Sequence, residues 1–154
     1  MDITFTRLTK IPLDRIAAHM SDPRVVAHMP LAVGGWDAAR CAAFVDMKEG
    51  FWTRDGLGHW AFLADGAYVG WGGFQKEGDD WDFGLVLTPD RFGLGQRIAF
   101  KALDFARADP RIPYVTFLLP LSRKHLRALD RLGARPQGEI DLGGARFRKF
   151  FLPT

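Results

Sequence analysis

Residues 81–108, WDFGLVLTPDRFGLGQRIAFKALDFARA, contain an alternating segment, a proline, two closely spaced glycines and a helical pattern, in that order. Side chains alternate along 81–87, which puts Phe83, Leu85 and Leu87 on one face of a strand and Asp82, Gly84 and Val86 on the other. Pro89 lacks a backbone donor and ends the strand. From residue 96 onward, apolar side chains recur at helical spacing. The stretch therefore predicts a strand, a glycine loop and a helix packed against a sheet.

The predicted glycine loop is a candidate anion site. Gly93 and Gly95 can adopt backbone angles closed to other residues, and they leave the main chain open to a ligand. The free N–H groups and the positive dipole end of the following helix point back at this loop. The same pattern is typical of an ordinary turn that caps a core helix. Both interpretations stay open on these residues alone.

The segment PDRFGLGQRI resembles the acyl-CoA pyrophosphate loop of the GNAT superfamily of N-acyltransferases, whose pattern is Gln/Arg-x-x-Gly-x-Gly/Ala. Gly95 stands at the invariant glycine, whereas Phe92 and Arg97 replace the first and last defined residues. An aromatic residue followed by glycine is common in the branch that resembles ribosomal-protein amino-terminal acetyltransferases. The resemblance implies that acetyl-CoA is the co-substrate. It implies that the diphosphate lies on Phe92, Gly93, Leu94, Gly95, Gln96 and Arg97.

Arg97 occupies a position at which the family has a small residue. Its side chain could crowd the place where backbone approaches phosphate, swing outward along the helix stripe that carries Lys101, or add a positive charge to the diphosphate. The sequence leaves these three outcomes open.

Periodicity and turn residues predict the remaining elements. Strands are expected at 3–8, 59–64, 68–74, 114–119, 135–142 and 145–152, and helices at about 12–20, 24–29, 38–52 and 122–132. Asp37 is the expected N-cap of the helix 38–52, whose apolar positions are Cys41, Phe44, Val45 and Met47. Ser122 is the expected N-cap of the helix 122–132.

The element order is the one that the GNAT superfamily uses, and the resemblance extends over nearly the whole chain in this order. It implies one α+β domain, residues 1–154, with a mixed, mostly antiparallel sheet of about seven strands flanked by about four helices. A right-handed crossover makes strand 114–119 parallel to strand 81–87. In the family this pair splays apart and the pantetheine arm lies in the gap, which implies main-chain contacts at Leu85 and Leu87. The N–H groups near Leu87 would also polarise the thioester carbonyl.

Acetyl transfer to an amine needs a group that removes a proton from the nucleophile. Asp82 is the first candidate, because DFGLVLTP resembles the Glu-Ile-Gly-Tyr strand of the related branch. The alternative is a solvated or salt-bridged strand acid. Glu77, Asp79 and Asp80 form an acidic rim that would attract a cationic amine, or simply a polar turn.

The segment SRKHLRALDRLGA is similar to the family's Asn-x-x-Ser-x-x-x-Leu-x-Lys-Leu-Gly-Phe segment. Ser122 stands for the asparagine, so the resemblance makes it a cofactor contact, and His125 stands for the serine. Many relatives carry a tyrosine as the acid for the leaving thiolate where this chain has Leu129. His125 and Ser122 are the candidate substitutes for that acid, and a surface role is the alternative for His125.

Composition limits the class of protein. With 154 residues, 47% hydrophobic and 25% charged, the chain is expected to be one soluble globular domain. The single cysteine, Cys41, excludes an internal disulfide, and no Cys/His cluster has metal-ligand spacing. The beginning of the chain lacks the pattern of a secretory leader, so a cytoplasmic protein is expected. A formal net charge of +3 suits an anionic ligand such as coenzyme A but is too weak to indicate nucleic acid.

Three functions compete. An N-acetyltransferase acting on a primary amine through a ternary complex is favoured. A noncatalytic acyl-CoA binder or sensor is motivated by Arg97 and the missing tyrosine. Nucleic-acid binding through Arg146, Arg148 and Lys149 competes with an edge strand guarded by charge. The acceptor amine is open, and so is the possibility that a homodimer completes the cleft.

Overall fold

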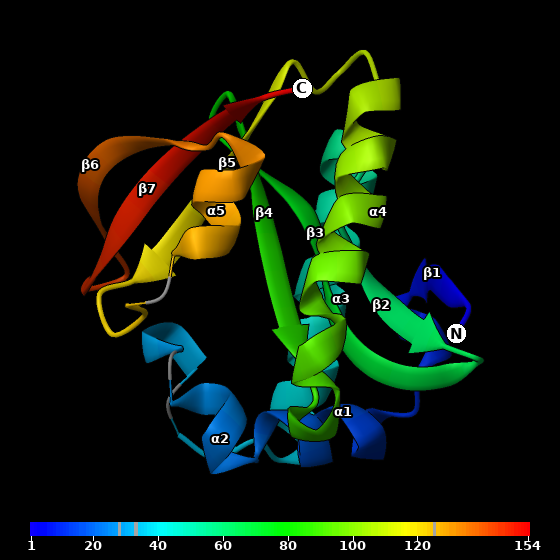
Figure 1. Cartoon of the computed structure of the whole chain (residues 1–154). Coiled ribbons are helices and arrows are strands. Elements are labelled where there is room, and N and C mark those ends of the chain that lie inside the picture. The colour runs from blue at the N-terminus through cyan, green and yellow to red at the C-terminus, as the bar shows by residue number, and fades with distance from the viewer. Residues whose placement is uncertain (28, 33, 125) are drawn as a thin grey trace.

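A computed structural model describes residues 1–27, 29–32, 34–124 and 126–154 (Figure 1). Seven strands form one sheet in the order β1-β2-β3-β4-β5-β7-β6. The strands are β1 (Ile3–Arg7), β2 (His59–Ala64), β3 (Ala67–Glu77), β4 (Asp80–Leu87), β5 (Tyr114–Pro120), β6 (Arg135–Leu142) and β7 (Ala145–Pro153). The predicted mixed sheet of about seven strands is confirmed.

Five α-helices lie in the described part of the chain, where about four were expected. They are α1 (Leu13–Met20), α2 (Pro23–Val26), α3 (Ala38–Asp55), α4 (Gly95–Ala108) and α5 (Arg127–Leu132). Three short 3-10 helices accompany them, η1 (Leu8–Lys10), η2 (Pro30–Ala32) and η3 (Pro89–Leu94). No described helix combines the length and the apolar character needed to cross a bilayer.

Each face of the sheet carries its own apolar cluster. In Figure 1, α4 crosses in front of the sheet and α3 lies behind it. The α4 side holds the fully buried Phe62 and Phe74, together with Phe83 and Leu87, as the alternation along β4 predicts. The other side holds a second cluster that includes Trp71. Removing a ring such as that of Phe74 from the core is expected to cost about 3–5 kcal/mol.

Helix α3 begins where the sequence predicts and ends three residues later than expected. The Asp37 side chain accepts the N–H of Arg40 at 2.8 Å, and Gly56 ends the helix with a φ of 74°. Met47, predicted to be apolar core, is instead 51% exposed, and Lys48 is buried in its place. The long aliphatic stem of Lys48 packs inward, and its ammonium donates to Gln75 Oε1 at 2.9 Å.

The parallel pair β4–β5 is joined only briefly. Ladder pairing covers Asp82 with Thr116 and Phe83 with Phe117, although β4 continues to residue 87 and β5 to residue 120. Along its whole length β5 instead pairs with β7, from Tyr114 to Pro120. Because β5 follows β7, it diverges from β4, and the gap between the two strands is visible in Figure 1. The predicted parallel pair is therefore present, and it splays.

Helix α5 is shorter than the predicted helix 122–132. Residues 122–124 lie outside it, in and after a turn in which the N–H of Arg123 donates to the Pro120 carbonyl at 3.0 Å, so Ser122 does not cap α5. These residues are exposed and carry no apolar side chain that could bury a helical face. Leu129 is buried as predicted, and Gly133 ends the helix with a φ of 83°. The predicted acid His125 lies outside the described residues.

Candidate functional site

Asp82 lies at the first of the two paired positions of β4 with β5, one residue before the last paired position, Phe83. Its Oδ1 accepts a hydrogen bond from the Thr116 hydroxyl of β5 at 2.9 Å. Burial raises the pKa of the Asp82 carboxyl to about 7, and the charges of Glu77 and Asp80 act in the same direction. The Thr116 hydrogen bond and the charge of Lys149 oppose the rise in pKa. Asp82 is therefore a carboxyl group that exchanges a proton near neutral pH.

A small cavity of about 70 Å³ opens beside Asp82. Its lining consists of Glu77, Asp80, Asp82, Thr116, Leu118, Ile140, Leu142 and Lys149. The other two carboxylates have partners of their own. Asp80 accepts from Lys149 Nζ at 2.5 Å and from the Tyr114 hydroxyl at 2.7 Å, and Glu77 accepts from Gln75 Nε2 at 2.8 Å. The pKa of Asp82 is raised, whereas the pKa of Asp80 is lowered, so Asp82 takes up a proton more readily than Asp80.

The start of α4 lies against the gap between the strands. A side chain at Gly95 would begin 3.6 Å from Leu87 Cδ1 and 3.7 Å from Leu85 Cδ2. The absence of a side chain at Gly95 therefore leaves space at the N-terminus of α4 beside the unpaired end of β4. The first N–H groups of a helix of this length attract an anion, and of these the Gly95 N–H already donates to the Phe92 carbonyl of η3.

The predicted loop between β4 and α4 is mostly helical. Residues 89–94 form η3, which is kinked at Arg91 (φ −123°, ψ 17°) and leads directly into α4. Gly95 has helical angles, φ −55° and ψ −45°, and Gly93 is not among the glycines with positive φ. Neither glycine therefore uses the backbone angles that are closed to other residues, because Pro89 at the first turn favours a helical course. The glycines matter here through the space they leave.

The other residues expected to bind the diphosphate differ in exposure and orientation. Phe92 and Gln96 are exposed, and Leu94 packs partly against the core. Arg97 points outward, and its Nη2 donates to the Met1 carbonyl at 2.8 Å. The neighbouring Lys101 donates to the Ile3 carbonyl in the same way. Of the three outcomes left open for Arg97, the structure shows the outward orientation.

The described residues show no clear candidate for the acid that would protonate the leaving thiolate. Leu129 is 8% exposed and belongs to the core. Ser122 lies on an exposed turn after β5. The two tyrosines are engaged elsewhere, because Tyr68 hydrogen-bonds His19 Nδ1 at 2.7 Å and Tyr114 donates to Asp80. The roles expected of Ser122 and His125 stay predictions.

Several polar residues near Asp82 escaped the sequence analysis. Thr116 and Lys149 reach the site from β5 and β7, and Lys48 and His59 lie buried on the α3 side of the sheet. Burial lowers the pKa of Lys48 to about 8, against the charges of Glu77 and Asp82. Burial and then the charge of Lys48 hold the pKa of His59 well below its usual value. The helical spacing from Phe44 to Lys48 was a usable signal for the burial of that lysine.

A larger cavity, of about 320 Å³, lies under the beginning of η3. It is lined by Arg15, Ala18, His19, Asp22, Arg24, Tyr68, Thr88, Pro89 and Asp90. It contains charges of both signs, and Arg24 and Asp22 already pair at 2.8 Å. Asp82 does not border this cavity and lines only the smaller of these two.

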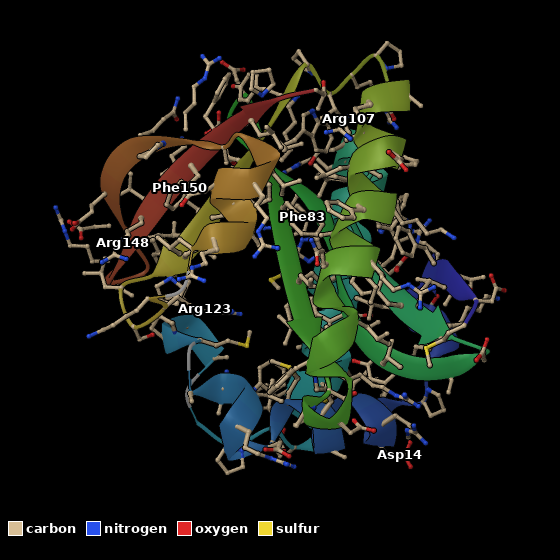
Figure 2. The ribbon with its side chains drawn as sticks, in the orientation of Figure 1. Asp14, Phe83, Arg107, Arg123, Arg148 and Phe150 are labelled. Atoms are coloured by element: carbon tan, nitrogen blue, oxygen red, sulfur yellow. The ribbon has the colours of Figure 1, made fainter. Side chains whose placement is uncertain are left out.

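The basic cluster considered for nucleic acid is largely neutralised. Arg146 pairs with Glu139 at 2.7 Å and with Asp141 at 3.1 Å, and Lys149 pairs with Asp80. Arg148 donates to the Arg123 carbonyl at 3.3 Å, and both side chains are labelled in Figure 2. These contacts favour charged guarding of the sheet edge over a phosphate-binding surface.

Comparison with known proteins agrees with this fold. The Acetyltransferase (GNAT) domain family matches residues 2–135. A GNAT-family acetyltransferase structure from Bordetella pertussis is similar with a TM-score of 0.76 and 16% identity, over 97% of this chain and 95% of that one. An acetyltransferase from Agrobacterium tumefaciens gives 0.77 and 15%, over 99% and 91%.

An aminoglycoside acetyltransferase in complex with coenzyme A and kanamycin is also similar. Its TM-score is 0.75 at 13% identity, over 99% of this chain and 95% of that one. At these identities the solved structures show a shared fold. No curated protein matches the sequence significantly.

Proposed function

The chain belongs to the Acetyltransferase (GNAT) domain family, and on that premise we propose that it transfers an acetyl group from acetyl-CoA to a primary amine by direct attack in a ternary complex. The observation that carries this proposal is Asp82, a carboxyl group with a pKa of about 7 at the point where β4 and β5 separate. A base with a pKa near the working pH is the most effective one for removing a proton from an attacking amine.

The gap between β4 and β5 is the proposed place for the acyl arm. The unpaired main chain at Leu85 and Leu87 would bind the pantetheine, and N–H groups at the start of α4 would bind the diphosphate. The space left at Gly95 supports this arrangement, since a side chain there would enter the region beside Leu85 and Leu87. The outward side chain of Arg97 has no part in it.

The reaction balances without a metal or a redox partner. The cationic amine first loses one proton to solvent. The neutral nitrogen then attacks the thioester carbonyl carbon, the C–N bond forms, and the C–S bond breaks. Asp82 takes the second proton that the nitrogen loses, directly or through a water molecule. The departing thiolate takes a proton from solvent, because a thiolate is a stable leaving group that needs no dedicated acid. Ser122 and His125 remain candidates for donating that proton.

The proposed acceptor is a cationic amine. Glu77 and Asp80 border the cavity beside Asp82 and would attract such a molecule. The similar aminoglycoside acetyltransferase was solved with kanamycin. The resemblance of DFGLVLTP to the ribosomal-protein amino-terminal branch instead favours a protein amino terminus. Antibiotics, polyamines, amino acids and peptide amino termini are therefore the acceptors to compare.

A noncatalytic acyl-CoA-binding protein is the second candidate. The specific observation behind it is Leu129, which is buried in the core where many relatives carry the acid. Such a protein would bind acetyl-CoA without cleaving the thioester, so it would release no free coenzyme A thiol.

The test is thiol release from acetyl-CoA with a panel of primary amines. Turnover is expected with at least one amine, and Asp82→Asn should lower kcat by about 10²–10⁴ while coenzyme A binding persists. Asp46→Asn, at an exposed carboxylate of α3, is the matched control. Binding without turnover for any amine would establish the noncatalytic function, and an undiminished Asp82→Asn enzyme would place the base elsewhere.

A further inference from the structure

Lys48 is a charged side chain that is almost entirely enclosed. It projects from α3 with 7% of its surface exposed. Its ammonium donates to Gln75 Oε1 at 2.9 Å and lies 5.1 Å from the centre of the Trp71 ring. Among the described residues it forms no ion pair with a carboxylate.

This arrangement is costly for stability alone. An ammonium group taken out of water without a contacting carboxylate loses several kcal/mol of hydration. The lysine at position 48 gains partial compensation from Gln75 and from the face of Trp71. A methionine of similar length would fill the same space without that cost. The cost of burying the Lys48 charge therefore indicates that this charge has a functional role.

Gln75 connects this charge to the candidate base. In the pairing of β3 with β4, Gln75 lies directly opposite Asp82. Directly opposed residues project from the same face of the sheet, with Cβ atoms about 4.5–5.5 Å apart. Gln75 thus anchors the Lys48 ammonium next to the Asp82 carboxyl, on the face where Thr116 also bonds that carboxyl.

We propose that Lys48, held by Gln75, is a positioning residue whose positive charge keeps Asp82 ionised and ready to accept a proton from the amine. This role rests on the proposed acetyl transfer. The Lys48 charge acts at short range through an interior that holds little water. Electrostatic interactions are stronger there than at the protein surface.

Other charged groups also act on Asp82. Lys149 of β7 pairs with Asp80 of β4 at 2.5 Å, and its charge lowers the pKa of Asp82 from the far side of β4. Glu77 of β3 adds negative charge, and Thr116 of β5 adds none. His59 of β2 is buried, and its Nδ1 has no hydrogen-bond partner among the described residues. Burial and the charge of Lys48 keep that ring neutral.

The test is the titration of the Asp82 carboxyl carbon by NMR, in the whole protein and without substrates. In Lys48→Met the pKa of Asp82 should rise by on the order of one unit, because the nearby opposite charge is gone. The acid limb of kcat/KM against pH should move upward with it. The thermal midpoint should stay the same or rise, since no charge remains buried.

Two further variants sharpen the result. Gln75→Glu gives Lys48 a carboxylate partner in place, and it should raise the pKa of Asp82 without removing the lysine stem. Lys76→Met is the control, because Lys76 is the next residue of β3 and lies over the Trp81 ring at 5.7 Å. It should leave the Asp82 titration unchanged.

The outcomes separate this inference from the proposed function. An Asp82 titration that is unmoved in both Lys48→Met and Gln75→Glu, with a lower thermal midpoint in Lys48→Met, would make Lys48 purely structural and overturn the inference. A raised pKa of Asp82 in a protein that acetylates no amine would support the electrostatic coupling and refute the proposed function.

Discussion

Asp80 and Asp82 lie two residues apart on one strand face, and their surroundings push their pKa values in opposite directions. Burial acts to raise the pKa of Asp80, but hydrogen bonds from Lys149 and Tyr114 outweigh it and the pKa falls. Burial raises the pKa of Asp82, and a single hydroxyl bond cannot offset it. Such a divergence between neighbouring carboxyl groups supports the proposed role of Asp82 as the proton acceptor, with Asp80 as a fixed charge.

The raised pKa of Asp82 predicts how stability depends on pH. Its pKa is 3.8 as a reference and about 7 in the folded protein, so between these values the native state holds more protons than the unfolded state. The contribution of Asp82 to stability is therefore full below about pH 4 and is lost as the pH rises through 7. Asp82→Asn should remove this loss, so the variant should gain stability relative to the natural protein between pH 4 and 8. Urea unfolding at several pH values measures this, and parallel stability curves would contradict it.

The position of Asp82 on β4 was predictable from sequence, and its partners were not. Strand alternation placed the residue, and the resemblance of DFGLVLTP suggested its role, which stays a prediction. Thr116 is 34 residues away along the chain, and Lys149 is 69 residues from Asp80. These contacts depend on the register between β4 and β5 and on the insertion of β7 beside β5, which no local pattern encodes.

At the scale of elements, two positively charged side chains of α4 hydrogen-bond to the main chain at and just before the edge strand β1. Arg97 donates to the Met1 carbonyl, and Lys101 donates to the Ile3 carbonyl. Arg97→Ala should leave the coenzyme A affinity within about twofold, a change of about 0.4 kcal/mol, and should increase hydrogen exchange in β1. Calorimetric titration and exchange measurements test the two effects. Tenfold weaker binding would show that Arg97 contacts phosphate after all, and tighter binding would show that it obstructs the site.

The junction of β4 with α4 carries a second prediction. Gly95→Trp should abolish coenzyme A binding while the domain stays folded, because the new side chain would begin 3.6 Å from Leu87 and extend into the opening. Asp104→Trp, on the exposed face of the same helix, should bind coenzyme A normally. Equilibrium binding and circular dichroism measure both properties. Unchanged binding by Gly95→Trp would place the coenzyme A site elsewhere.

Element boundaries were predictable where caps are explicit. Asp37 and Gly133 mark a helix start and a helix end in the structure as in the sequence. Ser122 resembled a cap, but Arg123 and Lys124 after it are exposed and charged and bury no apolar surface, and the helix begins only after Leu126. The inward turn of Lys48 was missed because its neighbour Met47 has the more apolar side chain, whereas the helix rotation decides which one faces inward.

At the scale of the whole molecule, the sheet consists of two parts with little direct pairing between them. Strands β1–β4 form one part and β5, β7 and β6 the other, and the ladder between them covers only residues 82–83 and 116–117. Local patterns predicted the strands of both parts. The splay followed only from the family resemblance, because periodicity reports which face is buried and not how far two strands stay together. A ligand in the gap would contact both parts and stabilise the folded domain.

The thermal midpoint with and without saturating acetyl-CoA tests the central claim, that this gap holds the acyl donor. At a hundred times the dissociation constant, the ligand should add about 2.7 kcal/mol to the stability of the folded state. For a domain of this size, the midpoint should rise by roughly 5–10 °C. Gly95→Trp should show no rise. No shift in the natural protein at saturating acetyl-CoA would contradict the account, because the gap between β4 and β5 would then not be an acetyl-CoA site.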